Sequence, residues 1–242
     1  MPMLRLGAAG TASLMGEWWV FELCSAMAGT LGIVPLAAHA SLQQLAFMGF
    51  ATVDGVAEAA TIRTGNRLGA GDPAGAKNAA VAVLCVLSGM LLVMVAIVAV
   101  LGGSITSIYT RNPEVMSMAA SVVPFYLCFL VADGFSFVTS SILRGAAKNT
   151  AAAKIVLLSS YGITLPVAAF LALYMGLGLL GLWVGLACGI TNAACWLLLH
   201  VWRLDWEGQS REAQANAAKA ALDEHREEKS MYDREEKSRG KD

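Results

Sequence analysis

The sequence predicts an all-α, polytopic membrane protein with six transmembrane helices. Hydrophobic residues make up 57% of the 242 positions and charged residues 14%. Soluble domains are usually about 45–50% apolar and about 25% charged. Eight of the 17 basic and eleven of the 18 acidic residues fall within 205–242. We therefore expect residues 1–204 to form a six-helix membrane unit and residues 205–242 to form a charged tail.

Six segments are apolar over the roughly 20 residues that a helix needs to cross a bilayer. They are 6–33, 36–60, 79–101, 116–142, 155–175 and 180–203. The third and fifth carry no charge. Carboxylates interrupt the first, second and fourth, whose flanks stay apolar for a full bilayer thickness. In the sixth, Gly181, Gly185 and Gly189 recur every four residues, which predicts a face for close helix packing.

The connections between these segments alternate in character. Val34-Pro35 and residues 176–179 form short links, whereas 63–77 and 144–154 are polar and basic. Six spans place 16 of the 17 Lys and Arg residues on one face of the membrane, with Arg111 opposite. The positive-inside rule then predicts that both termini are cytoplasmic. The pattern fits the plasma membrane and internal organelles equally.

Three lone carboxylates, Glu17, Glu22 and Asp133, lie inside the predicted spans. A charged side chain at the bilayer centre costs about 2.5–3.5 kcal/mol on insertion scales, so such residues usually face a cavity. A buried carboxylate can neutralise itself with a proton, or pair with an organic cation or Na⁺. If proton and cation compete for one carboxylate, binding one releases the other. That competition is the minimal physics of an antiporter.

Each carboxylate also has a structural interpretation. Glu17 and Glu22 are about 140° apart around a helix, so they do not share one narrow stripe. Either they face different surroundings, or one points into a cavity while the other helps to hold the helix packing. The structural interpretation of either residue is an interhelical hydrogen-bond anchor. Trp18 between them lines a cavity or packs. Asp133 either faces a cavity or bonds across the close contact formed by Gly134.

The remaining chemistry-bearing residues predict no enzyme. His39 could titrate near neutral pH, but we interpret it as a satisfied hydrogen-bonding side chain. All five cysteines lie in apolar stretches, which predicts reduced, buried thiols. Neither a metal-ligand cluster, nor a cofactor loop, nor a nucleophile–base pair is recognisable. The absence of a basic stripe predicts no nucleic-acid partner.

The tail is rich in Ala, Glu, Lys and Arg and repeats Arg-Glu-Glu-Lys-Ser at 226–230 and 234–238. This composition predicts a solvated helix or a disordered segment. A partner-binding role for the tail is the alternative.

Four motifs, taken in order, resemble the second half of the multidrug and toxic compound extrusion (MATE) transporters, particularly the eukaryotic branch. The resemblance covers Leu4 to about Leu204. The motifs are Glu17-Trp18-Trp19 with Phe21-Glu22, the string from Arg63 through Gly65-Asn66 to Leu68-Gly69-Ala70-Gly71-Asp72, Leu143-Arg144-Gly145, and Gly181-Leu182-Trp183-x-Gly185.

This resemblance implies one six-helix lobe of a twelve-helix exporter that moves organic cations in exchange for H⁺ or Na⁺, without a cofactor. In that family, acidic residues of the second lobe's first and fourth helices are implicated in coupling or substrate binding. They correspond to Glu17, Glu22 and Asp133. Gln44 occupies a position that is acidic in some relatives, so it is a candidate binding residue that cannot titrate.

The implied partners are a small organic cation, membrane lipid, and either a missing N-terminal lobe or a second copy of this chain. A different hypothesis is a non-transporting, truncated half that serves as a membrane partner or scaffold. A third is that the sequence is a piece of a longer gene product.

Overall fold

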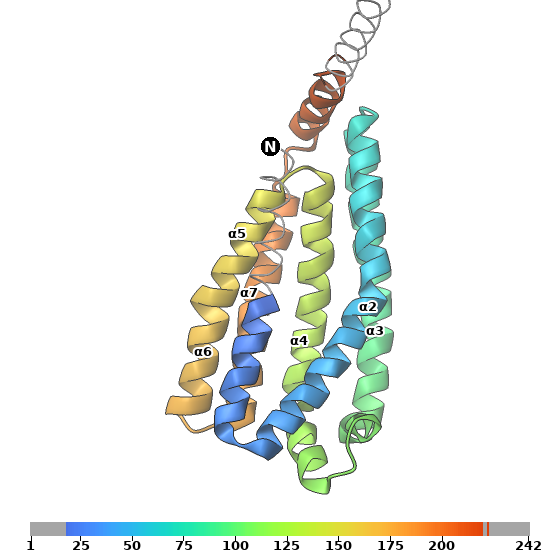
Figure 1. Cartoon of the computed structure of the whole chain (residues 1–242). Helices are drawn as coiled ribbons and strands as arrows, with labels where there is room; N and C mark the ends of the chain where they lie inside the picture. The colour runs from blue at the N-terminus through green and yellow to red at the C-terminus, as the bar shows by residue number, and fades with distance from the viewer. Residues whose placement is uncertain (1–17, 220–221, 223–242) are drawn as a thin grey trace, which may run out of the picture.

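The computed structural model describes residues 18–219 and residue 222, and these residues form a bundle of long helices without a strand (Figure 1). The predicted all-α fold is therefore confirmed. A helix at 18–31 precedes the labelled elements. They are α2 (Ile33–Gly69), α3 (Pro73–Leu101), a 3₁₀ segment (Gly102–Ile108), α4 (Pro113–Gly145), α5 (Asn149–Ser159), a π-helical segment (Ser160–Thr164), α6 (Leu165–Ala169), a second π-helical segment (Phe170–Tyr174) and α7 (Gly178–Trp202).

Within the described residues, five helices are long and apolar enough to cross a membrane. Four are α2, α3, α4 and α7, and the fifth is the continuous run Asn149–Tyr174. The first predicted span, 6–33, lies partly outside the described residues, and its described part is helical over 18–31. The count of six spans thus stays a prediction.

The helices extend well beyond the apolar segments. The polar stretch that begins at Arg63 was expected to connect two spans, yet α2 continues to Gly69 and α3 begins at Pro73. Hydropathy marks the part of a helix that lipid can surround, whereas a helix continues until a residue breaks its hydrogen-bond ladder. Here the break comes at Gly71, whose φ of 75° suits glycine.

The turn between the first two helices also differs from the expected position. We expected Val34-Pro35 to link them, but the break falls at Gly32, whose φ is 125°. Pro35 lies in the first turn of α2, where an N–H donor is not needed.

The glycines of α7 form a face for close helix packing, as the sequence predicts, and this face lies against the fifth predicted span. A Cβ atom at Gly185 would come within 2.5 Å of the backbone of Ala168 in α6. A Cβ atom at Gly181 would come within 2.6 Å of the Leu171 backbone. One at Gly189 would overlap the Thr164 side chain. The absence of side chains at these positions therefore allows α7 to pack directly against the neighbouring backbone.

The cysteines depart from the expectation of buried thiols. Cys24 is buried, but Cys85, Cys128, Cys188 and Cys195 are exposed on the surface of the chain. Apolar stretches of a membrane protein supply its lipid-facing surface as well as its core, so hydropathy does not predict burial there.

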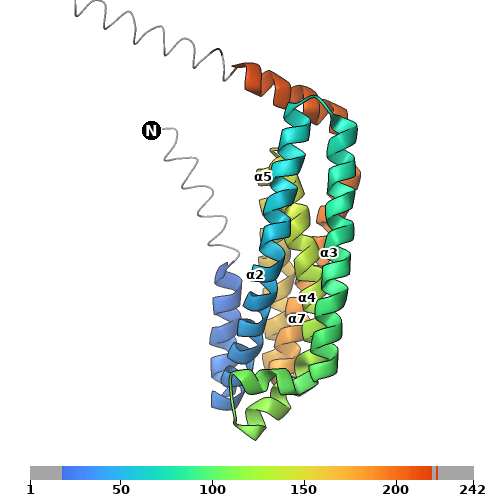
Figure 2. The same cartoon turned by 90° about the vertical axis from the view of Figure 1, so that its right-hand side faces the viewer.

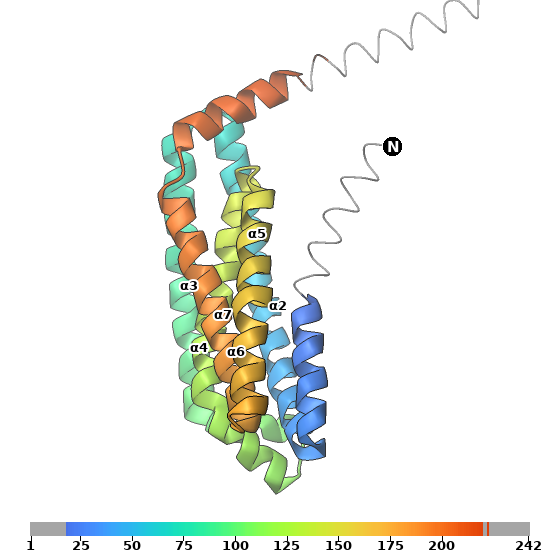
Figure 3. The ribbon, with the colours of Figure 1, turned by 90° about the vertical axis from the view of Figure 1, so that its left-hand side faces the viewer.

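The first part of the tail is a helix, 206–219, that packs across one end of the bundle (Figures 2 and 3). We call this the tail end, and the end that holds the 3₁₀ segment the opposite end. Ser210 donates a buried hydrogen bond of 3.0 Å to the carbonyl oxygen of Leu68. Glu212 pairs with Lys148 at 3.2 Å, and Trp206 packs against the cluster of Leu68, Ala76 and Ala146.

The tail helix thus joins the α2–α3 turn to the α4–α5 turn. The expectation of a solvated segment fails for this inner face of the helix. Both copies of the Arg-Glu-Glu-Lys-Ser repeat lie outside the described residues.

Replacing Gly185 with Ala is expected to destabilise the protein by about 1–3 kcal/mol, because the new methyl group overlaps the Ala168 backbone. Thermal unfolding in detergent measures the effect. Gly89→Ala in α3 is the matched control, since a Cβ there meets nothing within 4 Å. Equal melting temperatures for the two variants would contradict the α6–α7 contact.

The contacts of Asp72 predict that the stability of the first turn of α3 depends on pH. Its carboxylate accepts hydrogen bonds of 2.8 Å from the Gly75 backbone N–H and of 2.8 Å from Arg67. The Gly75 bond, then the Arg67 bond, hold the pKa of Asp72 below its usual value. A lowered pKa means that the charged group stabilises the fold above the unfolded pKa. That stabilisation is lost as the pH falls through the folded pKa.

Asp72→Asn keeps a good capping side chain but removes the charge. At pH 7, hydrogen-exchange protection of the first-turn amides of α3 is expected to be lower in this variant than in the wild type. In acid the two proteins are expected to converge as the wild-type carboxylate protonates. A difference that persists unchanged in acid argues against a role for the charge.

Candidate functional site

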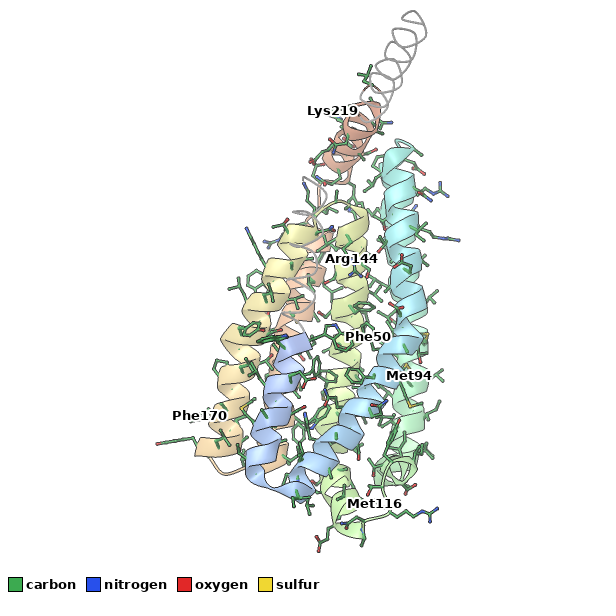
Figure 4. The ribbon with its side chains drawn as sticks, viewed as in Figure 1. Phe50, Met94, Met116, Arg144, Phe170 and Lys219 are labelled. Carbon is green, nitrogen blue, oxygen red and sulfur yellow. The ribbon has the colours of Figure 1, made fainter. Side chains whose placement is uncertain are left out.

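A cavity of about 130 Å³ lies between the 18–31 helix, α2, α4, the fifth span and α7. Figure 4 shows two of its lining residues, Phe50 near the middle of the bundle and Arg144 nearer the tail end. The cavity is lined by Trp18, Phe21, Ala46, Phe47, Phe50, Phe129, Asp133, Ser136, Phe137, Ser140, Arg144, Val156, Ser160 and Ile190. Asp133 and Arg144 are its charged lining residues.

One stripe of α4 supplies most of the polar wall. Asp133, Ser136, Phe137, Ser140 and Arg144 line the cavity at helical spacings of three and four residues. Arg144 follows Asp133 by eleven positions, which is about 16 Å along a helix axis. The cavity therefore runs along α4 from a carboxylate deep in the bundle to a guanidinium near the tail end.

Glycine contacts set how α4 presents this stripe. A Cβ atom at Gly134 would lie 3.0 Å from Leu91 of α3, and one at Gly49 of α2 would lie 2.9 Å from Leu130. These close approaches hold α4 between α2 and α3 and fix its rotation. Asp133, next to Gly134, is half-buried and faces the cavity.

Aromatic rings form the apolar wall. Trp18 stacks on Phe47 with ring centroids 5.4 Å apart, and Phe50 lies 4.4 Å from Phe137. Such rings present a negative π-face, which attracts organic cations.

Arg144 is held at the tail-end mouth by two contacts. Its guanidinium lies 5.5 Å from the centroid of the Phe137 ring and donates a hydrogen bond to the Ser141 hydroxyl. A contact of this kind contributes roughly 0.5–1 kcal/mol at an exposed site. The guanidinium is exposed, and these two contacts keep it beside the cavity.

A π-helical segment supplies another hydroxyl. Ser160 lines the cavity from Ser160–Thr164, where the helix widens by one residue per turn. Segments of this kind occur frequently at functional sites because they re-aim side chains that a regular helix would direct elsewhere.

The structure brings together two of the five predicted site residues, Asp133 and Trp18. Glu22 and Gln44 are exposed on the surface of the described chain and do not line the cavity. Glu17 lies outside the described residues. Gln43, the neighbour of Gln44, instead accepts a 3.2 Å hydrogen bond from Ser25 and ties the 18–31 helix to α2.

Sequence reasoning missed the phenylalanines, the serines and Arg144 as lining residues. The α4 members could have been found by counting three, four, seven and eleven residues on from Asp133. Phe50 and Ser160 carry no such signal, because their places depend on how α2 and the fifth span rotate against α4.

The arrangement suits a cationic, partly aromatic guest. A carboxylate can neutralise the charge, the rings can cover the apolar body, and Ser136, Ser140 and Ser160 can hydrogen-bond to polar groups. Among residues 18–219 no group of three or more His, Cys, Asp or Glu is placed to hold a metal ion.

Comparison with known proteins gives a consistent result. The family model described as MatE matches residues 11–170. Multidrug and toxin extrusion protein 1 of Xenopus tropicalis is 35% identical over 216 residues, covering 89% of this chain and 38% of that protein. Multidrug and toxin extrusion protein 2 of Homo sapiens is 27% identical over 218 residues, covering 90% of this chain and 36% of that protein.

Among solved structures, the eukaryotic MATE transporter AtDTX14 is similar with a TM-score of 0.78 and 24% identity. The alignment covers 88% of this chain and 48% of that one. This likeness concerns the fold. The chain thus spans less than half the length of the relatives that it matches.

A fluorescent aromatic cation is expected to bind in this cavity. Asp133→Asn is expected to weaken binding about tenfold, which corresponds to loss of about 1.4 kcal/mol of charge interaction. Titration of the purified protein followed by anisotropy measures the affinity. Asp54→Asn is the matched control, because Asp54 is exposed on α2 and does not line the cavity. Equal affinities for the two variants would remove Asp133 from the site.

Proposed function

The chain belongs to the MatE family, and from that membership we propose that it is the C-terminal lobe of an exporter that moves organic cations in exchange for H⁺ or Na⁺. Members of this family are transporters, and the chain is an integral membrane protein with several spans. The observation that carries the proposal is Asp133 in an aromatic cavity within the bundle.

The depth of Asp133 supports a coupling role. It lies twelve residues before the tail end of α4 at Gly145, which is about 18 Å along the axis. A bilayer core is about 30 Å thick, so this distance supports a position of the carboxylate near its middle. A proton and an organic cation that compete for this carboxylate exchange with each other, which couples the two fluxes.

The other lining residues have distinct proposed roles. Trp18, Phe50 and Phe137 hold the apolar body of the cation by stacking and cation–π contacts. The serines of α4 bind polar groups or water. Arg144 repels a second cation from the tail-end mouth, which limits occupancy to one.

Glu22 and Gln44 support the need for a second lobe. Both are exposed at mid-depth, about 14 Å from the end of the 18–31 helix and about 16 Å from the start of α2, respectively. Polar groups at this depth do not face lipid. We propose that they face a cleft between this lobe and its partner, where Glu22, Gln44 and the neighbouring Glu17 contact substrate or ion.

Charge favours a distinct N-terminal lobe over a second copy of this chain. Glu22 on the 18–31 helix and Asp54 and Glu58 on α2 are all exposed and acidic. Two copies that met through this surface would bring like charges together, which is unfavourable in a medium of low dielectric constant.

The tail end is proposed to be cytoplasmic. Arg63, Arg67, Lys77, Arg144 and Lys148 lie at the ends of helices there, in agreement with the positive-inside rule. The 206–219 helix lies at the same end (Figure 1).

Proteoliposomes with an imposed pH or Na⁺ gradient test the function. We expect gradient-driven flux of a fluorescent organic cation when this chain is reconstituted with the separately expressed N-terminal half of the Xenopus relative. Asp133→Asn is expected to abolish that flux, while Asp54→Asn retains it. If no gradient drives flux in any combination although the two chains co-purify, the chain acts as a non-transporting membrane partner instead.

A further inference from the structure

His39 lies on α2, about 9 Å along the helix axis from its first residue, Ile33. Its exposed fraction is 1%, and neither ring nitrogen has a hydrogen-bond partner within the described chain. The expectation of a satisfied hydrogen-bonding histidine is therefore wrong.

The imidazole sits against a layer of aromatic rings. Its centroid is 5.7 Å from the ring of Trp183, whose indole N–H is also buried without a partner. Trp183 contacts Phe129 at 5.5 Å and Tyr126 at 5.7 Å. Phe129 in turn lines the cavity that holds Asp133. This ring layer (His39, Tyr126, Phe129 and Trp183) therefore separates the cavity from the opposite end of the bundle.

Three buried nitrogens without partners are costly, since each unsatisfied buried polar group costs about 1–3 kcal/mol. A histidine with a purely structural role is expected to have a hydrogen-bond partner. An apolar side chain would fill the same space without the free-energy cost of unsatisfied nitrogens. The retained imidazole is best explained by a second state of the protein in which its nitrogens reach water.

The electrostatic surroundings offer the imidazole no stabilising charge. The titratable groups in the same core cluster are Cys24 from the 18–31 helix and Tyr126 from α4, and both are neutral near pH 7. From α7 the neighbour is Trp183, which does not titrate, and none of the ion pairs found in residues 18–219 involves His39.

We propose that His39 is a second proton-binding residue of this lobe, which takes up a proton from the opposite side only when the ring layer opens. The proposal rests on the proposed proton-coupled exporter and adds a residue to it. Burial disfavours the imidazolium in the closed layer, whereas hydration in the open layer permits it. By linkage, a lower pH at the opposite end of the bundle increases the fraction of molecules in which the ring layer is open.

Trp183 provides an optical test that does not require transport, because a protonated imidazole quenches a neighbouring indole. The full chain in lipid nanodiscs is titrated between pH 8 and pH 5, the range in which an exposed histidine changes charge. We expect reversible quenching in the wild type that is lost both in Trp183→Phe and in His39→Gln. His39→Gln keeps hydrogen-bonding capacity and similar size without a titrating group.

The contribution of Trp183 is the fluorescence of the wild type minus that of Trp183→Phe. If this difference does not change between pH 8 and pH 5, the proposal is overturned. Quenching that persists in His39→Gln overturns it as well. If His39→Gln does not fold, the comparison of wild type with Trp183→Phe still decides the outcome.

A flux assay separates this proposal from the exporter function itself. In proteoliposomes with the partner lobe, His39→Gln is expected to lower cation flux and to flatten the dependence of that flux on the pH at the opposite end. An unchanged pH profile overturns the role of His39 while leaving the exporter intact. Absence of flux in the wild type refutes the exporter, and the fluorescence titration then still reports whether His39 binds a proton.

Discussion

The close packing of α4 between α2 and α3 is the constraint on which the rest of the structure depends. A bilayer offers no hydrogen bonds, so every polar group must be placed against protein or water. Glycines allow the necessary approach: a Cβ atom at Gly145 would overlap the Thr61 carbonyl, and one at Gly134 would press on Leu91. The Thr61 hydroxyl also donates to the Ser141 carbonyl oxygen at 3.0 Å. Because these contacts fix the rotation of α4 about its axis, the polar stripe of this helix faces the cavity.

Much of the fold follows from hydropathy, because the cost of exposing polar backbone to lipid leaves few alternatives to helices. The positions of the helix ends follow from different physics. At Gly32 and Gly71 the backbone adopts positive φ, and these breaks set where the first helix and α2 end. Within the described residues, hydropathy therefore identified five helices that can cross a membrane but misplaced the turns between them.

The candidate site was less predictable, because a residue's facing depends on contacts distant in sequence. Asp133 and Glu22 give the same local signal, a lone carboxylate in an apolar run. The structure turns Asp133 into a cavity and Glu22 outward. Similarly, nothing local distinguishes the docked face of the 206–219 helix from its solvated face. Ser210 is buried only because Leu68, 142 residues away in sequence, presents its carbonyl oxygen there.

The tail helix makes the two ends of the lobe mechanically unequal. At the tail end, one helix is bonded to both turns, so the ends of α2, α3, α4 and α5 are braced against one another. At the opposite end, Gly32, Gly176 and Gly178 have positive φ, and a Cβ atom at either of the last two would meet open space. The bundle is therefore more rigid at the tail end than at the opposite end. Bending of the helices relative to one another is therefore expected at the end that lies beyond His39, not at the braced tail end.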